Sequence, residues 1–211
     1  MQMSAEYGRH VMPCSLLLIL SCVLAIAGCS DDYKIVGVGS QGPGILQVIM
    51  KSDDADSILV IAGDSARVTE GSGDSLALSV SQGRAFRGAD YATLYGSLQD
   101  YLQLIKTYNP IRKQSGTYQS LLLFQSYLPP ANYDSLTFEL NASYLQIGYY
   151  QIPLSPVQGA GDFVTFIQSF RIEEGRTTVV TLHVKPLSSL VRVGDSFQYS
   201  WIFDLVQITY P

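Results

Sequence analysis

The stretch Phe197-Gln198-Tyr199-Ser200-Trp201-Ile202-Phe203-Asp204-Leu205 carries a large apolar side chain at every second position. Successive side chains of a β-strand point to opposite faces, so this spacing predicts one strand with a fully apolar face. Burying a large apolar side chain stabilises a fold by roughly 2 kcal/mol, so we expect this strand to contribute strongly to the core. The five residues on the apolar face are Phe197, Tyr199, Trp201, Phe203 and Leu205.

Short strand-like runs separated by turn residues continue from Ile45 to the end of the chain. Turn signals recur about every 8 to 12 residues, which is typical of a β-sandwich or barrel. Residues 173–176 read as a hairpin turn that joins strands at 163–172 and 180–184. The chain has 14 tyrosines and only 15% charged residues, a composition that favours strands over helices. We therefore expect one mainly β domain over residues 45–211.

Residues 90–108 break this pattern because their apolar positions are spaced by three and four. Asp90 can cap the start of a helix, and Asn109-Pro110 can end it. The spacing predicts one amphipathic helix that packs on a sheet, and a tyrosine edge facing a ligand is the less favoured interpretation. The apolar positions are Tyr91, Leu94, Tyr95, Leu98, Tyr101, Leu102 and Ile105.

An apolar run near the N-terminus ends in the small residues Ala27 and Gly28, followed by Cys29. The run has about 13 residues, whereas a membrane-spanning helix needs roughly 20, so it is typical of a secretory signal peptide over residues 1–28. Cleavage between Gly28 and Cys29 makes Cys29 the first mature residue. Cys14 and Cys22 leave with the leader, so the exported domain has no disulfide to support it.

Ile26-Ala27-Gly28-Cys29 resembles the lipobox of bacterial lipoproteins. The resemblance implies that Cys29 carries acyl chains, each stabilising membrane attachment by about 0.8 kcal/mol per buried methylene. An ordinary secretory signal with a chance cysteine is the alternative. Residues 29–44 then form a flexible tether rich in Gly and Ser.

The residues that follow Cys29 are candidate export signals. Ser30 resembles the residue that lets enteric sorting machinery pass lipoproteins to the outer membrane. Together, Ser30, Asp31 and Asp32 resemble a short acidic tag that sends some lipoproteins to the outer face. A plain solvated tether is an equally good interpretation of these three residues.

Three segments resemble a bacterial family of lipoprotein domains of unknown function, family 4382. They are the opening strand 44–48 with its acidic turn 53–56, the Leu-Pro-Pro-Ala turn within 128–136, and residues 170–182. The resemblance covers about residues 44 to 208. It implies an antiparallel, immunoglobulin-like or transthyretin-like β-sandwich on an envelope lipoprotein, and it implies no known activity.

Few residues suit catalysis or metal binding, and we expect no cofactor. The Gly-x-Gly-x-x-Gly spacing at 37–42 precedes Pro43 and a strand rather than a helix, so it predicts a linker and not a nucleotide site. Strand alternation places His183, the single histidine after the leader, toward solvent, which argues against a Ser-His-Asp triad. Weak calcium candidates are Asp53, Asp54 and Asp56, although they lack the glycine and distal Glu of an EF-hand and favour a solvated turn.

The net charge of −5 argues against a nucleic-acid partner. Tyrosines give large contact area at low entropic cost, so Tyr144, Tyr149 and Tyr150 are candidates for binding a protein or glycan, although core packing explains them equally well. We expect a non-enzymatic binding or structural module of the cell envelope, anchored in the outer membrane. Two alternatives are a strand-donating subunit of a surface appendage and an envelope polysaccharide hydrolase, which requires a cleft lined by two or more carboxylates.

Overall fold

The computed structural model describes residues 42–211, except residues 62, 100–104 and 159–162. The chain divides into two units, Met1–Ser40 and Gln41–Pro211, and all described residues belong to the second. Within the described residues, no helix has the length and apolar character needed to cross a membrane. Several predictions lie outside the described residues: the signal peptide 1–28, its cleavage site at Gly28 and Cys29, the acylation of Cys29, and the export candidates Ser30, Asp31 and Asp32.

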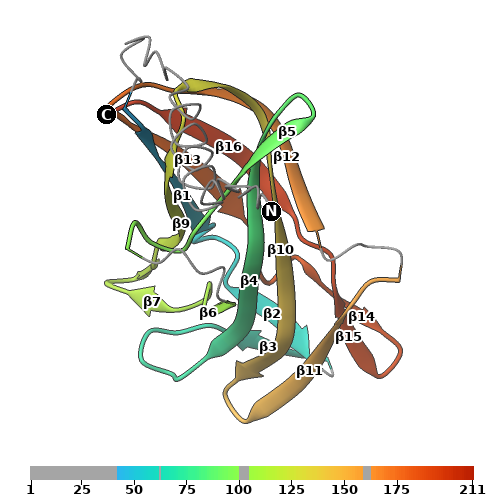
Figure 1. The fold of residues 1–211 in the computed structure, drawn as a ribbon. Helices are drawn as coiled ribbons and strands as arrows, with labels where there is room; N and C mark the ends of the chain where they lie inside the picture. Colours follow the sequence, from blue (N-terminus) through green and yellow to red (C-terminus); the bar gives the residue numbers. More distant parts are fainter. Residues whose placement is uncertain (1–41, 62, 100–104, 159–162) are drawn as a thin grey trace, which may run out of the picture. The chain divides into compact units, whose positions relative to one another are not determined.

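The described residues are mainly β, as the sequence predicts (Figure 1). One sheet has the strand order β16-β13-β1-β9, and a larger sheet has the order β14-β15-β11-β10-β4-β5, with β12 paired to β10 and β6 paired to β4. The strands of the first sheet are β1 (Gly44–Ser52), β9 (Leu121–Leu128), β13 (Thr177–Val184) and β16 (Phe203–Thr209). Those of the larger sheet are β4 (Ser75–Arg87), β5 (Asp90–Thr93), β6 (Lys106–Tyr108), β10 (Ala131–Ile147), β11 (Tyr150–Pro156), β12 (Phe163–Ile172), β14 (Leu190–Val193) and β15 (Ser196–Tyr199).

Two small two-stranded sheets complete the described strands. They are β2 (Ile58–Ile61) with β3 (Asp64–Arg67), and β7 (Lys113–Gln114) with β8 (Thr117–Tyr118). The second of these pairs lies directly after β6 along the chain, and it shapes the pocket described below.

The prediction of an amphipathic helix over residues 90–108 is wrong. The described parts of this segment include β5 and β6, which pair with residues 84–87 and 78–80 of β4, respectively. Leu94 is buried in the core, whereas Ile105 is 72% exposed, so the apolar residues do not share one buried face. Pairing with β4 satisfies the backbone groups of these strands, and this tertiary contact overrides the helical spacing of the side chains.

Most strand pairs are antiparallel, as predicted, but two are parallel, β1 with β13 and β11 with β15, so the arrangement is mixed. The hairpin predicted at residues 173–176 does not form, because β12 pairs with β10 whereas β13 pairs with β1 and β16. The turn instead carries the chain from one sheet to the other. Gly44 lies against this turn, where a Cβ atom would collide with the Glu173 carbonyl oxygen and Ile172 Cγ2.

The apolar stretch 197–205 forms two strands rather than the single strand that its alternation predicts. Phe197 and Tyr199 lie in β15, which ends at Tyr199, whereas Phe203 begins β16 in the other sheet. Between the two strands, the backbone pairs with a neighbouring turn: Ser200 N donates to Ser189 O at 2.8 Å, and Lys185 N donates to the Ile202 carbonyl at 3.0 Å. These bonds replace the ladder bonds of a continuous strand, so the stretch changes sheets at its middle.

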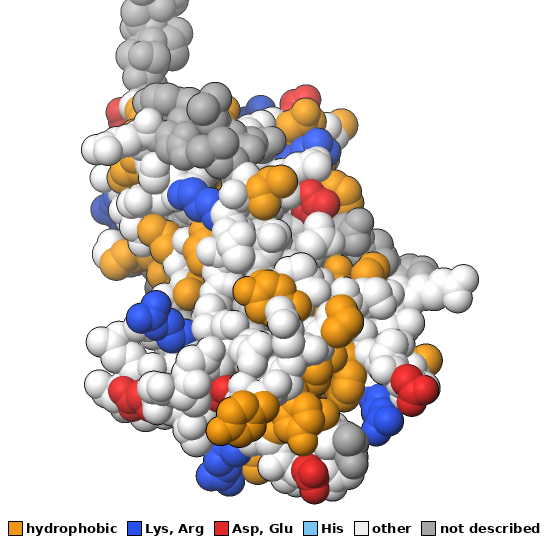
Figure 2. All heavy atoms as spheres, turned by 90° about the horizontal axis from the view of Figure 1, so that it is seen from below, with side chains coloured by type: hydrophobic (Ala, Val, Ile, Leu, Met, Phe, Trp, Pro, Cys, Tyr) orange, Lys and Arg blue, Asp and Glu red, His pale blue; other side chains and the backbone are white. Residues whose placement is uncertain are grey.

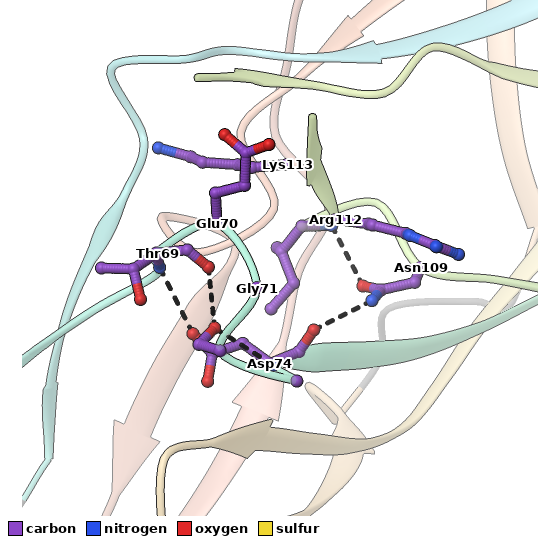
Figure 3. A pocket seen from close by; sticks show the side chains of 10 residues that line it. Thr69, Glu70, Gly71, Asp74, Asn109, Arg112 and Lys113 are labelled. Atoms are coloured by element: carbon purple, nitrogen blue, oxygen red, sulfur yellow. Dashed lines mark hydrogen bonds between the residues drawn. The ribbon is translucent and has the colours of Figure 1, made fainter. Parts of the chain in front are cut away.

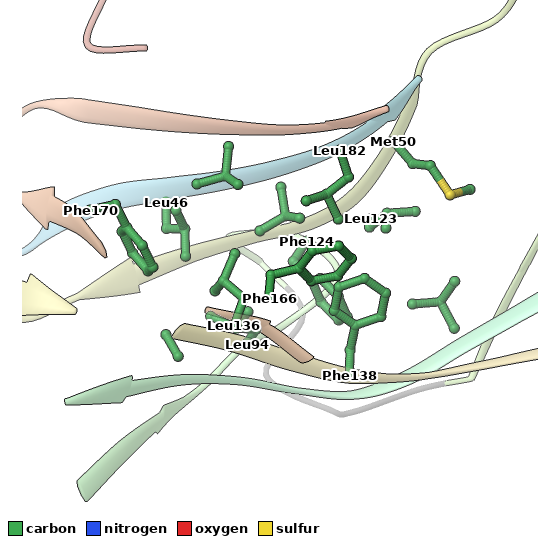
Figure 4. Packing of buried hydrophobic residues seen from close by; sticks show 14 of the residues in the cluster. Leu46, Met50, Leu94, Leu123, Phe124, Leu136, Phe138, Phe166, Phe170 and Leu182 are labelled. Carbon is green, nitrogen blue, oxygen red and sulfur yellow. The ribbon is translucent and has the colours of Figure 1, made fainter. Parts of the chain in front are cut away.

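Buried side chains form two clusters. The main core contains residues of both larger sheets, such as Leu46, Leu182 and Phe138, and the rings of Phe138 and Phe166 stack with centroids 5.6 Å apart (Figure 4). A second core contains Leu145 and Ile147 from the far half of β10, together with residues of β2, β14 and β15. The 17 residues of β10 therefore join the two clusters.

Candidate functional site

A pocket of about 500 Å³ opens between the loop at residues 69–74, which precedes β4, and residues 109–113, which follow β6 (Figure 3). This volume falls within the roughly 300–1,000 Å³ of typical small-molecule sites. We call it the loop-end pocket. It is lined by Thr69, Glu70, Gly71, Ser72, Gly73, Asp74, Asn109, Ile111, Arg112 and Lys113.

The 69–74 loop folds around the buried side chain of Asp74. One carboxylate oxygen accepts from Thr69 N at 3.4 Å, and the other accepts from Gly148 N at 2.9 Å. The Ser72 hydroxyl donates to the Thr69 carbonyl at 2.7 Å, and a glycine on each side of Ser72 adopts a positive φ, as a tight turn requires. Asp74 thereby ties this wall of the pocket to the turn between β10 and β11.

The side chain of Asn109 holds the two walls together. Its amide nitrogen donates to the Asp74 carbonyl at 3.0 Å, and its oxygen accepts from Leu76 N at 3.1 Å and from Ile111 N at 3.2 Å. The pairing of β6 with β4 brings Asn109 to this position. The prediction that Asn109-Pro110 ends a helix is therefore replaced by a bridging role between two loops.

The pocket brings together two carboxylates, Glu70 and Asp74, which is the number that the hydrolase alternative requires. Both are held by backbone donors: the oxygens of Glu70 accept from Ser115 N and Gly116 N, each at 2.9 Å. These two hydrogen bonds lower the pKa of Glu70 from its usual value. A general acid at neutral pH needs a raised pKa, so the lowered pKa of Glu70 makes this residue unsuited to act as a general acid.

Two cationic side chains, Arg112 and Lys113, extend to different sides of the pocket (Figure 3). The Lys113 ammonium lies 4.7 Å from the centre of the Tyr118 ring, which supports its position. Within the described part of the chain, neither cation forms an ion pair, and the Arg112 guanidinium donates no hydrogen bond. These two side chains are therefore available to a ligand.

Tyr118 links this wall of the pocket to the acidic turn between β1 and β2. Its buried hydroxyl donates to the Asp56 carbonyl at 2.8 Å. Burial, assisted by the nearby carboxylates of Asp56 and Asp54, raises the pKa of the Tyr118 hydroxyl far above its usual value. Tyr118 therefore stays neutral and serves as a hydrogen-bond donor that supports the ring beneath Lys113.

The carboxylates of the weak calcium candidates accept hydrogen bonds from three separate segments of the chain. Asp53 accepts from Ala55 N at 3.0 Å, Asp54 accepts from Tyr118 N at 2.7 Å, and buried Asp56 accepts from the turn at 187–188, including Leu187 N at 2.6 Å. Over residues 42–211, gaps aside, no group of three or more His, Cys, Asp and Glu side chains is placed to hold a metal ion. The structure thus uses this acidic turn to join separate segments.

Of the three candidate tyrosines, Tyr149 lies in the turn between β10 and β11, Tyr150 begins β11, and Tyr144 lies within β10 opposite Pro153. Tyr144 and Tyr150 are 40% and 44% exposed, and Tyr149 is fully exposed, so none of them is a core residue. The preceding Gly148 is the residue bound to Asp74, which places this turn beside the loop-end pocket. Figure 2, which views the lower end of Figure 1 face on, shows exposed hydrophobic side chains among separated basic and acidic ones.

His183 lies on the face of β13 opposite the buried Leu182 and Val184, as alternation predicts. It is half-buried rather than open to solvent, and its Nε2 has no hydrogen-bond partner among the described residues. No Ser-His pair forms there within that part of the chain.

The cations of the pocket were missed by the sequence prediction. The turn around residues 71–74 is recognisable from its glycines, but Arg112 and Lys113 join it only through the pairing of β6 with β4. Comparisons with protein-family models, curated proteins and solved structures find no match to this chain.

Proposed function

We propose that this protein is a bacterial outer-membrane lipoprotein, anchored by acyl chains on Cys29, whose β-domain is a non-enzymatic binding module of the cell envelope. The lipobox-like sequence before Cys29 supports the anchor. The resemblance to family 4382 and the two-sheet core support an immunoglobulin-like or transthyretin-like sandwich. The ligand, a glycan or a protein, binds at the loop-end pocket.

One observation carries this proposal: the pocket and the start of the domain lie at opposite ends of β1. At the first end, Gly42 N donates to Glu174, and at the other end the Ser52 hydroxyl donates to the Pro110 carbonyl beside the pocket. A strand rises about 3.3 Å per residue, so the nine residues of β1 separate these ends by roughly 26 Å. A domain tethered through the residues before Gly42 therefore presents the pocket away from its attachment point.

The non-enzymatic part of the proposal is supported by the state of the carboxylates in the pocket. Glu70 and Asp74 each accept backbone N–H donors, and the pKa of Glu70 is lowered. A retaining or inverting glycosidase needs one carboxyl group with a raised pKa to protonate the leaving group. Glu70 and Asp74 instead fit a structural role, in which their carboxylates hold the loops around the pocket in place.

The anchor is tested by growing cells with labelled palmitate. We expect label on the natural protein and none on the Cys29→Ala variant. Cys22→Ser, which changes a leader cysteine, is the matched control and should keep the label. Equal labelling of the Cys29→Ala variant would refute the anchor.

The binding role is tested with the full-length protein in detergent micelles and isolated envelope fragments. Thr69→Trp places a bulky ring at the pocket and should abolish retention on the fragments. Thr107→Trp, at an exposed position on β6 outside the pocket lining, should leave retention unchanged. Retention that is insensitive to Thr69→Trp would contradict a loop-end binding site.

A second candidate, a subunit of a surface appendage, is favoured by the edge strand β12. Within the described residues β12 pairs only with β10, and its Ile167 is 88% exposed. An exposed strand edge can accept a strand from another protomer. Sedimentation of the full-length protein in micelles tests this candidate: concentration-dependent assembly favours it, and one protomer per micelle at all concentrations removes it.

A further inference from the structure

We infer that the loop-end pocket binds an acidic polysaccharide, with Arg112 and Lys113 contacting anionic groups on neighbouring sugars. This inference rests on the proposed binding function and names its ligand class. The anionic groups are carboxylates or phosphates, since a guanidinium fork matches either one with paired hydrogen bonds.

The first argument is that the cations are available and the carboxylates are not. Arg112 is exposed and forms no ion pair within the described residues, and Lys113 is held on the Tyr118 ring. Glu70 and Asp74 have their oxygens directed at backbone N–H groups of the surrounding loops. A ligand that enters the pocket therefore meets cations with no ion-pair partner among the described residues, and carboxylates that already accept backbone N–H groups.

The second argument is the spacing of the two cations. As neighbours along the chain, Arg112 and Lys113 direct their side chains to different sides of the pocket (Figure 3). A single small anion would contact one of them at a time. A chain of sugars with repeated acidic groups can contact both while a sugar ring occupies the pocket of about 500 Å³ that both side chains line.

The third argument is the polarity of the pocket, which favours a saccharide over an acidic peptide. Ile111 is the one large apolar residue that lines the pocket, and its fully buried side chain is not available to contact a peptide side chain. The walls offer the Thr69 hydroxyl and the backbone N–H groups of Gly71 and Gly73, which have no partner among the described residues. The fully exposed ring of Tyr149, next to the Asp74-bound Gly148, provides an aromatic face beside the pocket.

The test is calorimetric titration of the full-length protein in detergent micelles with a short oligogalacturonate and with an acidic phosphomannan fragment. The neutral methyl ester of the same oligogalacturonate, poly-L-glutamate and inorganic phosphate are the comparison ligands. We expect one or both acidic glycans to bind, with an affinity that falls as salt is added, because exposed charges are screened. Binding of only one glycan identifies the anion as carboxylate or phosphate.

The double variant Arg112→Gln/Lys113→Gln should lower this affinity by at least about tenfold, since it removes two charge-assisted contacts. Its matched control is Arg171→Gln/Arg176→Gln, which removes the same charge from two cations already paired with Glu173. We expect the control to bind as tightly as the natural protein. Thermal unfolding of both double variants shows whether either has lost its fold.

Three results would overturn the inference: binding that survives Arg112→Gln/Lys113→Gln, equal binding of the methyl ester or poly-L-glutamate, and no binding of either acidic glycan. If the methyl ester or poly-L-glutamate binds and Thr69→Trp abolishes that binding, the proposed binding function stands with a different ligand. If envelope fragments are retained regardless of Thr69→Trp, the proposed function itself fails.

Discussion

The two ends of β1 each carry a pocket, of about 500 Å³ at the loop end and about 480 Å³ at the tether end. In the tether-end pocket, the charges satisfy one another: Glu173 pairs with Arg171 at 3.4 Å and with Arg176 at 3.1 Å, and Glu174 accepts from Gly42 N. In the loop-end pocket, the carboxylates bind backbone and the cations have no ion pair within the described residues. Volume alone does not distinguish the two pockets, whereas the availability of charge does.

At the loop end of β1, we expect the loss of the Asp56 side chain to lower the stability of the fold the most. Asp56→Ala removes several hydrogen bonds to the turn at 187–188 and leaves buried N–H groups unsatisfied, so we expect a loss of about 3 kcal/mol in the free energy of unfolding. Urea unfolding monitored by circular dichroism measures it. Asp53→Ala is the control, since among the described residues the Asp53 side chain accepts only from the nearby Ala55 N, and it should cost less than about 1 kcal/mol.

The tether end depends on close backbone packing rather than on charge. Gly44→Ala places a methyl group against the Glu173 carbonyl oxygen, so the turn must shift, at an expected cost of about 2 kcal/mol in the free energy of unfolding. Gly42→Ala is the matched control because its added Cβ meets only the movable Glu174 side chain. Equal unfolding midpoints for the two variants would contradict this packing.

Tyr118→Phe removes the hydroxyl that donates to the Asp56 carbonyl and keeps the ring under Lys113. We expect a loss of about 1 kcal/mol in the free energy of unfolding, the usual value for one hydrogen bond, together with little change in glycan affinity. Tyr149→Phe, at a fully exposed position, should not change stability. A large loss of affinity in Tyr118→Phe would show that the hydroxyl does more than support the pocket.

The smallest expected effect is on the pH dependence of stability. The backbone donors lower the pKa of Glu70 below 4.5, so its bonds to Ser115 and Gly116 stabilise the fold above that pH and are lost as the pH falls through the lowered pKa. Glu70→Gln should therefore flatten the acid side of the stability profile. Unfolding midpoints recorded in steps from pH 6 to pH 2 measure the slope, and identical slopes would refute the assignment.

The sequence predicted the strand content well and the connections poorly. Alternation correctly placed Leu182 and Val184 in the core, and the apolar runs at β1 and β12 are strands. Three predictions were wrong for one reason, because each segment's structure depends on which strand lies alongside it. They are the helix at residues 90–108, the hairpin at 173–176 and the single strand at 197–205. A local pattern sets which face of a segment is apolar, but it does not choose the partner.

The sequence by itself determined that residues 45–211 are mainly β, because side-chain alternation is a property of the chain alone. It also determined the resemblance of residues 26–29 to a lipobox, which depends on residue identities and not on tertiary contacts. Only the tertiary structure decided that Asp56 joins separate segments, that the cations at Arg112 and Lys113 face a glycine loop, and that the carboxylates there are occupied. Those properties arise from strand pairing between residues far apart in the chain, and pairing is chosen by the energy of the whole core.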